Sequence, residues 1–360
     1  MTIHQTSGLD GIAVAVTALS HVDGEAGELV IAGSRVGDLA LAESFEGVVA
    51  RLWSAAGAEN RTEAETRAVL AEARRRAFDR LENILPATDG LSIVDGFRAA
   101  VAAIGPRDGI PPEAMSVGAM PVLAAALVRR AAGKPAIAPD ASLGHAADTL
   151  KMLRGEPASG AEAKALGAYL VTVSDHGMNA STFAARVVAS TQADLFMAVT
   201  SAYCALSGPL HGGAPGPVLD MLDAIGSSAN IAPWVDAALA RGDRLMGFGH
   251  RIYKVRDPRA DVLKRAVDSL GAGQADLGFT AEVEVYAREA LAKAKPGRRL
   301  DTNVEFYTAI LLDALKVPRE AFTPVFAVGR SAGWTAHAIE QQRTGRLLRP
   351  TSVYAGPMPV

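Results

Sequence analysis

Three of the seven histidines lie in short segments that contain glycine, and these segments carry the strongest functional signal in the sequence. They are His176 in 174–179, His211 in 208–213 and His250 in 247–251. Glycine lets the backbone approach a small ligand closely, and imidazole can exchange protons near neutral pH. Cations that include Lys254 and Arg259 follow the third segment. Imidazoles beside clustered cations suit a site that binds a small polycarboxylate and moves protons on it.

Each segment also has a purely structural interpretation. The turn around His176 precedes a helix for which Ser181 and Thr182 are good N-cap residues, so this histidine is also explained as an ordinary loop residue. The glycines beside His211 fit a helix terminus that needs a positive φ equally well. The cations after His250 could form a solvated basic loop, although a histidine between glycines argues against that interpretation.

Glu305 has two interpretations as well. Thr302 and Glu305 match a capping box, in which the glutamate side chain accepts a hydrogen bond from the N-cap backbone. A carboxylate could instead act as a general base beside the histidines. Taken alone, the spacing favours capping.

Residues 329–333 match G-x-S-x-G, and the apolar run 324–328 could be the strand before a nucleophile elbow. A hydrolase of that type needs an acid and then a histidine after the serine. After Ser331 the remaining histidine, His337, precedes any acid, so the order is wrong. The match is therefore interpreted as a coincidence, and Arg330 becomes a candidate carboxylate ligand.

Helical patterns dominate the chain that must position these residues. Apolar residues recur at spacings of three and four in 63–85 (ended by Pro86), 92–104, 121–130, 161–173, 181–190, 233–240, 283–294 and 302–316. Strand patterns are limited to 13–18 and 29–32, which could form a small N-terminal sheet. Because strands and helices do not alternate, the sequence predicts an all-α fold with roughly fifteen or more helices.

Composition and charge exclude several classes of protein. The length of 360 residues predicts a large and a smaller domain. The net charge of −3 predicts no bulk attraction to nucleic acid or to an acidic membrane. The apolar stretch 114–128 is interrupted by Pro121 and is too short to span a bilayer, and residues 1–8 lack the apolar core of a signal peptide. The single cysteine, Cys204, is predicted to be a buried, unreactive thiol. A cytoplasmic protein is expected, and no histidine or cysteine spacing favours a metal site.

In this order, the segments resemble the citrate synthase family over nearly the whole chain. The matching stretches are 8–12, 44–46, 174–182, 208–214, 247–254, 257–259, 303–307, 330–337 and 349–350. The resemblance implies an all-α fold with a large domain (1–211 and 311–360) and a smaller mobile domain (212–310) that closes over the substrates. It also implies a homodimer that condenses acetyl-CoA with oxaloacetate to citrate and CoA. Acyl-CoA is then a co-substrate, and no cofactor is permanently bound.

The resemblance also implies a role for each candidate site residue. His211 donates to the thioester oxygen of acetyl-CoA, His250 polarises the ketone of oxaloacetate, and Glu305 is the catalytic base. Lys254 contacts a phosphate of CoA. The residues that hold oxaloacetate are His176, Asn179, Arg259, Arg330 and Arg349 of the partner subunit.

The sequence departs from the family in three places. The family base is usually aspartate, and the extra methylene of Glu305 can displace the carboxylate by about 1 Å, which costs on the order of 10²-fold in rate. The usual Arg-Gly-Tyr near the N-terminus is Ala-Gly-Ser at 32–34, and the usual Ala-Asn-Glu or Ala-Asn-Gln is Ala-Pro-Gly at 214–216. The CoA side and the base are therefore altered. Two alternatives stay open: a 2-methylcitrate synthase that uses propionyl-CoA, and a weakened paralogue that binds a dicarboxylate as a sensor or partner subunit.

Overall fold

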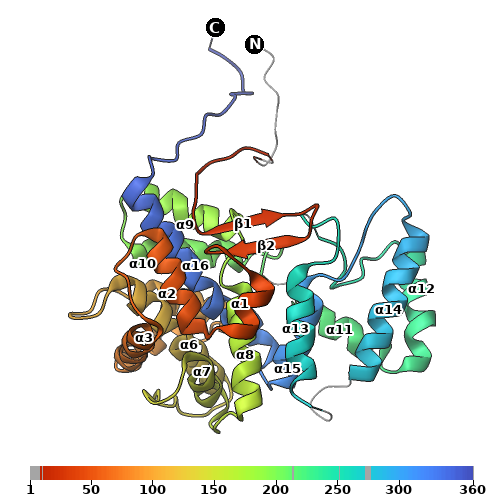
Figure 1. Cartoon of the computed structure of the whole chain (residues 1–360), viewed down its shortest axis with the longest axis horizontal. Coiled ribbons are helices and arrows are strands. Elements are labelled where there is room, and N and C mark those ends of the chain that lie inside the picture. The colour runs from red at the N-terminus through yellow and green to blue at the C-terminus, as the bar shows by residue number, and fades with distance from the viewer. Residues whose placement is uncertain (1–8, 10, 213–214, 251, 272–276, 360) are drawn as a thin grey trace.

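The computed structural model describes residues 9, 11–212, 215–250, 252–271 and 277–359. Its α-helices are α1 (Val36–Ala42), α2 (Phe45–Ala56), α3 (Glu63–Phe78), α4 (Leu81–Ile84), α5 (Ile93–Ala102), α6 (Pro112–Ala131), α7 (His145–Arg154), α8 (Gly160–Val173), α9 (Ala180–Ser190), α10 (Leu195–Leu206), α11 (Pro215–Ile225), α12 (Ile231–Ala240), α13 (Pro258–Asp268), α14 (Leu277–Ala294), α15 (Val304–Ala314) and α16 (Phe322–Thr344). The strands β1 (Ser20–Asp23), β2 (Glu28–Ile31) and β3 (Ser34–Arg35) form one antiparallel sheet in that order. The predicted all-α fold with a small N-terminal β element is confirmed (Figure 1).

Two long helices form the centre of the main body. α6 packs against α3, α5, α7 and α16, and α16 also packs against α2, α8, α9 and α10. Most side chains of α16 are buried, including Arg330 and Trp334. Because helices surround α16, packing fixes the position of Arg330 from several sides.

Pro121 does not interrupt the apolar stretch, so that prediction is wrong. α6 runs continuously from Pro112 to Ala131 with Pro121 inside it. Proline removes one helical hydrogen bond, but the helix is held by neighbours on several sides. Among the described residues, this helix is the one long and apolar enough to cross a membrane, and 89% of its apolar window is buried inside the protein. Its hydrophobicity is therefore used in the core.

Several predicted elements have different bounds in the structure. The helices predicted over 121–130 and 283–294 begin earlier, at Pro112 and Leu277. The helix predicted over 63–85 is broken after Phe78, and the short helix α4 follows. Leu81 and Ile84 of α4 are buried, so the apolar pattern continues across the break and conceals it. The strand predicted over 13–18 is wrong because β1 begins later, at Ser20, whereas the strand predicted over 29–32 is confirmed as β2.

A smaller group of helices lies beside the main body. Figure 1 shows α11, α12 and α14 on one side of the molecule, with α13 and α15 between them and the remaining helices. α13 packs against α15 and also against α1 and α8 of the main body. These helices fall largely within 212–310, the range predicted for the smaller domain. The domain boundaries and the mobility stay predictions.

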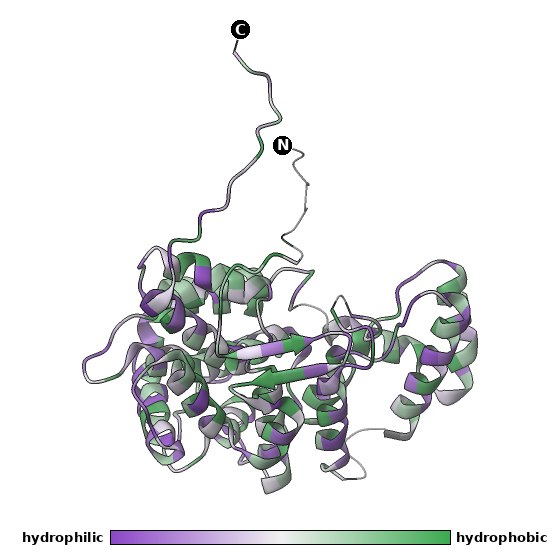
Figure 2. Ribbon diagram, turned by 45° about the horizontal axis from the view of Figure 1, so that its top comes forward, coloured by the Kyte–Doolittle hydropathy of each residue, from purple (hydrophilic) through white to green (hydrophobic). Residues whose placement is uncertain are grey.

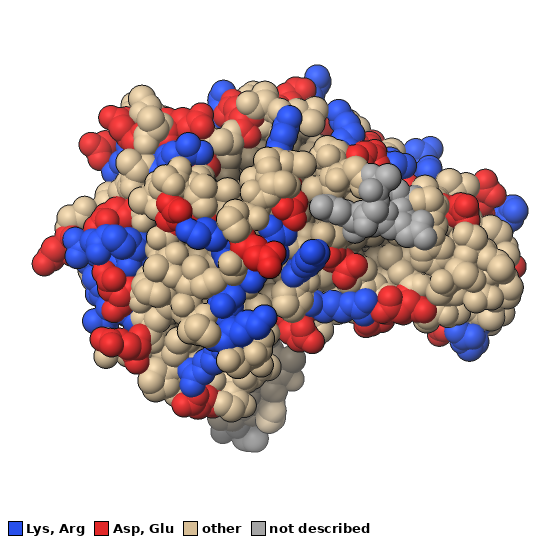
Figure 3. All heavy atoms as spheres, turned by 90° about the horizontal axis from the view of Figure 1, so that it is seen from below, with Lys and Arg blue, Asp and Glu red and all other residues tan. Residues whose placement is uncertain are grey.

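The segment before β1 contacts α16 at one side of the main body. The backbone N–H of Ala18 donates to Glu340 of α16 at 2.9 Å, across 322 positions of sequence. The segment after α16 extends away from the helices (Figures 1 and 2), and its Leu347, Tyr354 and Met358 side chains are exposed. Positive and negative side chains are interspersed on the face drawn in Figure 3.

Candidate active site

Loops and helix ends bring most of the predicted site residues together. The segment 174–179 joins α8 to α9 and carries His176, and the segment before α13 carries His250. The rings of these two histidines lie 5.8 Å apart between centroids in an edge-to-face arrangement. Tyr253 contacts both, because its hydroxyl lies 3.0 Å from His176 Nε2 and its ring centroid lies 4.8 Å from that of His250. Two distant segments therefore meet at one point.

Backbone donors determine the protonation of His250. Its Nδ1 accepts hydrogen bonds from the N–H groups of Ile252 and Tyr253, at 3.0 and 3.1 Å. A neutral ring that accepts at Nδ1 carries its proton on Nε2. Burial, aided by the charge of Arg259, lowers the pKa of His250 to about 4. His250 is therefore a neutral donor at Nε2, suited to polarising a carbonyl oxygen.

His211 lies against the first turn of α9. Its Nε2 is 2.9 Å from Ser181 Oγ and 3.2 Å from Asn179 Oδ1. Burial, with a smaller contribution from the charge of Arg330, lowers the pKa of His211 to about 4. Burial, followed by the charges of Arg259 and Arg330, also lowers the pKa of His176 well below its ordinary value. All three predicted histidines are therefore neutral at physiological pH.

Asn179 is the N-cap of α9, so the predicted caps Ser181 and Thr182 are wrong. Its Oδ1 accepts the N–H groups of both residues at 3.1 Å. An asparagine side chain at the N-cap reaches the N–H groups of the second and third helical residues, and here it also hydrogen-bonds to the hydroxyls of Ser181 and Thr182. Ser181 uses its hydroxyl to contact His211 and to accept the indole N–H of Trp334 at 3.1 Å.

Two buried arginines supply positive charge. Arg259 donates to both oxygens of Asp257, at 2.8 and 3.0 Å, and Asp257 is itself buried. Arg330 is 1% exposed, and its Nε donates to the carbonyl of Val173 at 2.5 Å. Burial lowers the pKa of Arg330 to about 10. Among the described residues Arg330 forms no ion pair, and a buried cation of this kind is stabilised by an anionic ligand.

Glu305 occupies the first turn of α15 but does not cap the helix, so the predicted capping box is wrong. The N-cap is Asn303, whose Oδ1 accepts the N–H of Glu305 at 3.0 Å. The Glu305 side chain is half-buried. Burial, opposed by Arg259 and assisted by Asp257, raises the pKa of Glu305 to about 7. A carboxyl group with this pKa can both accept and release a proton near neutrality.

Two predicted site residues lie away from this cluster in the single chain. Lys254 is exposed and forms an ion pair with Glu25 in the turn between β1 and β2. Arg349 is exposed in the segment after α16. Residues 213–214 and 251 lie outside the described residues, so the altered sequence at 214 is not placed. The roles predicted for Lys254 and Arg349 stay predictions.

Tyr253, Asp257 and Asn303 are site residues to which the sequence analysis gave no role. Tyr253 bridges the histidines, Asp257 pairs with Arg259, and Asn303 caps the helix of Glu305. A local signal exists for Asp257, because an Asp-Pro pair is a common start of a helix and places the side chain at the N-cap. Tyr253 carries no such signal, since its partner is 77 positions away.

The nucleophile elbow is absent from the described residues around 329–333. Ser331 is buried within α16 and donates to the carbonyl of Val328 at 2.8 Å, and the run 324–328 is helical. His337 instead contacts the carboxylate of Asp175 at 3.1 Å. The interpretation of the G-x-S-x-G match as a coincidence is therefore confirmed.

Cys204 is exposed, so the predicted buried thiol is wrong. Met197 of the same helix, seven positions earlier, is 59% exposed. Residues seven apart lie on the same side of a helix, so this side of α10 faces outward despite its apolar sequence. Among the described residues, no three histidine, cysteine or acidic side chains are close enough to hold a metal ion.

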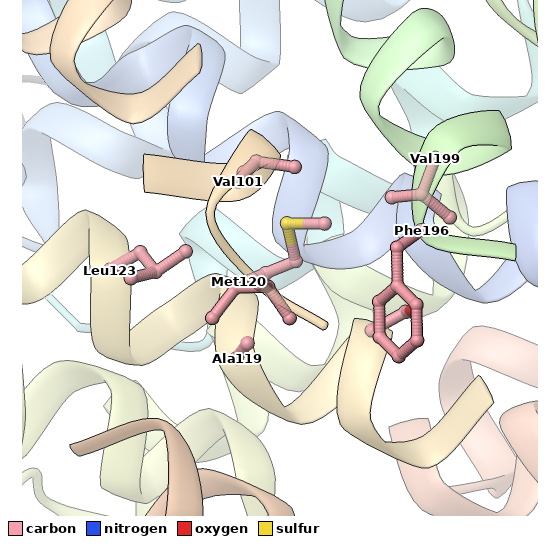
Figure 4. Close-up of a pocket in the computed structure, with 8 residues that line it drawn as sticks. Val101, Ala119, Met120, Leu123, Phe196 and Val199 are labelled. Atoms are coloured by element: carbon pink, nitrogen blue, oxygen red, sulfur yellow. The ribbon is translucent and has the colours of Figure 1, made fainter. Parts of the chain in front are cut away.

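Two hollows lined by described residues lie away from this cluster. Figure 4 shows an apolar cavity lined by Val101, Met120, Phe196 and their neighbours. Its free volume of about 10 Å³ has room for one water molecule at most. A second hollow, of about 430 Å³, lies beside α1, α7 and α8 and includes His145. The candidate site is recognised by its polar groups.

The chain is similar to citrate synthases along almost its full length. A model of the family described as citrate synthase, C-terminal domain, matches residues 8–351. The citrate synthase of Haloferax volcanii is 37% identical, with 97% of this chain and 95% of the relative covered. The 2-methylcitrate synthase of Mycobacterium tuberculosis is 36% identical, with 97% and 90% covered. The predicted resemblance is confirmed, and the chain belongs to the citrate synthase family.

Solved structures agree with this assignment. The citrate synthase of Thermotoga maritima has a TM-score of 0.84 at 32% sequence identity, with 98% of this chain and 96% of that chain covered. The citrate synthase of Thermoplasma acidophilum, solved as a ternary complex with carboxymethyl coenzyme A and oxaloacetate, has a TM-score of 0.86 at 28% identity. That comparison covers 98% of this chain and 96% of the other.

Proposed function

We propose that the protein condenses acetyl-CoA with oxaloacetate to give citrate and CoA. The observation that carries this proposal is a carboxyl group with a pKa of about 7, Glu305, in the same site as neutral imidazoles and buried guanidinium groups. The relatives of this chain in the citrate synthase family support the same reaction.

The chemistry begins with proton removal from the methyl group of acetyl-CoA. Glu305 takes this proton, and His211 donates a hydrogen bond to the thioester oxygen as negative charge develops there. The arginines Arg259 and Arg330 hold the carboxylates of oxaloacetate, together with His176 and Asn179. These groups prepare a nucleophilic carbon and a fixed electrophile.

Carbon–carbon bond formation follows. The enolate carbon attacks the ketone carbon of oxaloacetate, and His250 Nε2 gives its proton to the ketone oxygen as negative charge develops there. Glu305 releases the proton that it removed to water, and His250 regains one from water. Water then cleaves the thioester, which adds hydroxyl to the acyl carbon and releases CoA as the free thiol. Closure of the site delays that water until the new bond exists.

We further propose a cytoplasmic homodimer in which Arg349 of the partner subunit completes the oxaloacetate site. The exposure of the segment after α16 supports this assembly, since that segment is free to reach another chain. The single cysteine fits a reducing compartment.

The direct test is release of CoA thiol from acetyl-CoA and from propionyl-CoA, each with and without oxaloacetate. Oxaloacetate-dependent release, faster with acetyl-CoA, is the expected result. Faster release from propionyl-CoA would instead support a 2-methylcitrate synthase, which the 36% identical relative favours. No release from either substrate would refute both activities.

A weakened paralogue is the remaining candidate, and two observations favour it. Glu305 replaces the usual aspartate, and Lys254 is paired with Glu25 rather than free for a phosphate. The Glu305→Asp variant separates the candidates. A large gain in rate would support a degraded site, whereas a loss would mean that the site is built around glutamate.

A further inference from the structure

Asn303 forms three hydrogen bonds between two segments of the candidate site. Its side-chain Oδ1 accepts the N–H of Glu305 at 3.0 Å, and its Nδ2 donates to the carbonyl of Gly249 at 2.8 Å. Its backbone N–H donates to the carbonyl of Gly247 at 3.0 Å. One residue therefore contacts both the segment that leads into His250 and the helix turn that carries Glu305.

The two segments are closely paired around this residue. The N–H of Gly249 donates to the carbonyl of Asp301 at 2.7 Å, and Phe248 forms an antiparallel bridge with Thr302. Gly247 and Gly249 have φ values of +83° and +81°, which favour glycine. A Cβ on Gly249 would also lie 2.9 Å from a carbon of Leu300. The segments 247–249 and 300–303 cannot move relative to each other without breaking these hydrogen bonds or closing the approach at Gly249.

The amide of Asn303 has a function that other side chains of similar size cannot perform. It must accept one hydrogen bond and donate another at the same time, and a carboxylate or an alkyl group cannot do both. Serine could still accept the N–H of Glu305, as an N-cap residue does, but it is too short to reach Gly249. The cap and the bridge can thus be separated by mutation.

We infer that Asn303 is a positioning residue that fixes the Glu305 carboxylate relative to the His250 imidazole. This inference rests on the proposed condensation, in which Glu305 creates the nucleophilic carbon of acetyl-CoA and His250 activates the ketone carbon of oxaloacetate that this nucleophile attacks. Because Glu305 and His250 act on two different substrates, their relative position controls bond formation. A displacement of about 1 Å in such an arrangement costs on the order of 10²-fold in rate.

The test compares Asn303→Ser with wild type in CoA release. We expect kcat to fall about 10- to 100-fold, while KM for oxaloacetate changes less than about threefold, because the carboxylate ligands are untouched. The carbonyl carbon-13 shift of oxaloacetate bound to the enzyme is measured in parallel. It is expected to move towards the value of free oxaloacetate as His250 leaves its position.

Asn303→Asp is the second variant, which guards against simple unfolding. It keeps an acceptor for the cap and removes the donor to Gly249, so the variant is expected to fold and to lose activity. Its added charge disfavours ionisation of Glu305, and kcat is therefore compared at the plateau of the pH profile.

Asn230→Ser is the matched control, since the Asn230 amide donates to the carbonyl of Ile225 at 3.1 Å, away from the site. It is expected to leave kcat within twofold.

The outcomes separate this inference from the proposed function. If wild type releases no CoA with oxaloacetate, the proposed function fails before the variants are measured. If wild type is active and Asn303→Ser keeps kcat within twofold, the inference is overturned. A lower kcat with an unchanged carbonyl shift also overturns it, because Asn303 would then act on Glu305 alone. A fall in the melting temperature that accounts for the lost activity in both variants would have the same effect.

Discussion

The segment around His176 and the segment around His250 each supply a neutral imidazole, yet they are held in different ways. The first is anchored by buried side chains of α9 and α16. Arg186 donates to His337 Nδ1 at 2.9 Å, and His337 contacts Asp175 at 3.1 Å. The second is anchored mainly by backbone hydrogen bonds and by close approaches at glycine. The first arrangement ties a site residue to the core, whereas the second ties it to another site residue.

This difference separates stability from catalysis. Changes in the buried network beside His176 leave charges without partners in the core, which destabilises the whole fold. Changes to the backbone contacts beside His250 leave the buried Arg259–Asp257 pair in place but alter distances between reacting groups. Mutations in the two regions should therefore give different patterns of kcat and free energy of unfolding.

Glu305→Gln is expected to have the largest effect. It removes the proposed base and leaves the cap of α15 intact, because Asn303 caps that helix through the backbone of residue 305. We expect kcat to fall about 10²- to 10⁴-fold, the usual contribution of a general base. CoA release and thermal unfolding are measured together, and an unchanged kcat would rule out Glu305 as the base.

His337→Leu breaks the other side of the comparison. It leaves the fully buried carboxylate of Asp175 without its imidazole hydrogen-bond partner, and a buried charged group that loses its donor costs about 1–3 kcal/mol or more. Urea unfolding measures the change. His337→Gln keeps a donor and should lose less. A loss below about 1 kcal/mol for the leucine variant would contradict the view that this network stabilises the fold.

The pH dependence sharpens the comparison further. The raised pKa of Glu305, about 7, means that the carboxylate form is present above that pH and is lost as the pH falls. His211 and His250, with pKa values lowered to about 4, stay neutral over the same range. We expect kcat to fall about tenfold per pH unit below roughly pH 6. A flat kcat profile down to pH 5 would contradict this assignment.

Glu25→Gln is expected to have the smallest effect. The ion pair of Glu25 with Lys254 joins the β1–β2 turn to the segment between His250 and Arg259. Both side chains are exposed, so the pair is weak. If Lys254 contacts a phosphate of CoA, freeing Lys254 from the ion pair with Glu25 should lower KM for acyl-CoA about two- to fivefold. Glu28→Gln, which breaks a pair with Arg35 instead, is the control.

The sequence was sufficient to predict the helical class and most of the residues in the site. Helices α5, α8, α9 and α12 follow from apolar periodicity, which reports the buried face directly. The glycines near His250 indicated close approach, and the structure has positive φ values at both. The family resemblance predicted the common site, which local patterns could not assemble.

The failures at helix caps are local, whereas other differences depend on how elements distant in sequence pack together. Pro121 is tolerated inside α6 because neighbouring helices hold that helix. Cys204 is exposed because its side of α10 has no covering element among the described residues. The ion pair of Lys254 with Glu25 likewise joins residues 229 positions apart, and the predicted role of Lys254 stays a prediction. A local sequence pattern contains none of this information.

The contact between Ala18 and Glu340 has a consequence for folding. The two residues are 322 positions apart, and Lys254 of the site segment donates through its backbone to Gly24 of the same N-terminal region. During synthesis on the ribosome, the contact between Ala18 and Glu340 cannot form until α16 has emerged. Contacts of such long range close late and slow folding. The β1–β2 region should therefore be among the last parts to become protected from hydrogen exchange, and the site should form only with nearly the whole chain present.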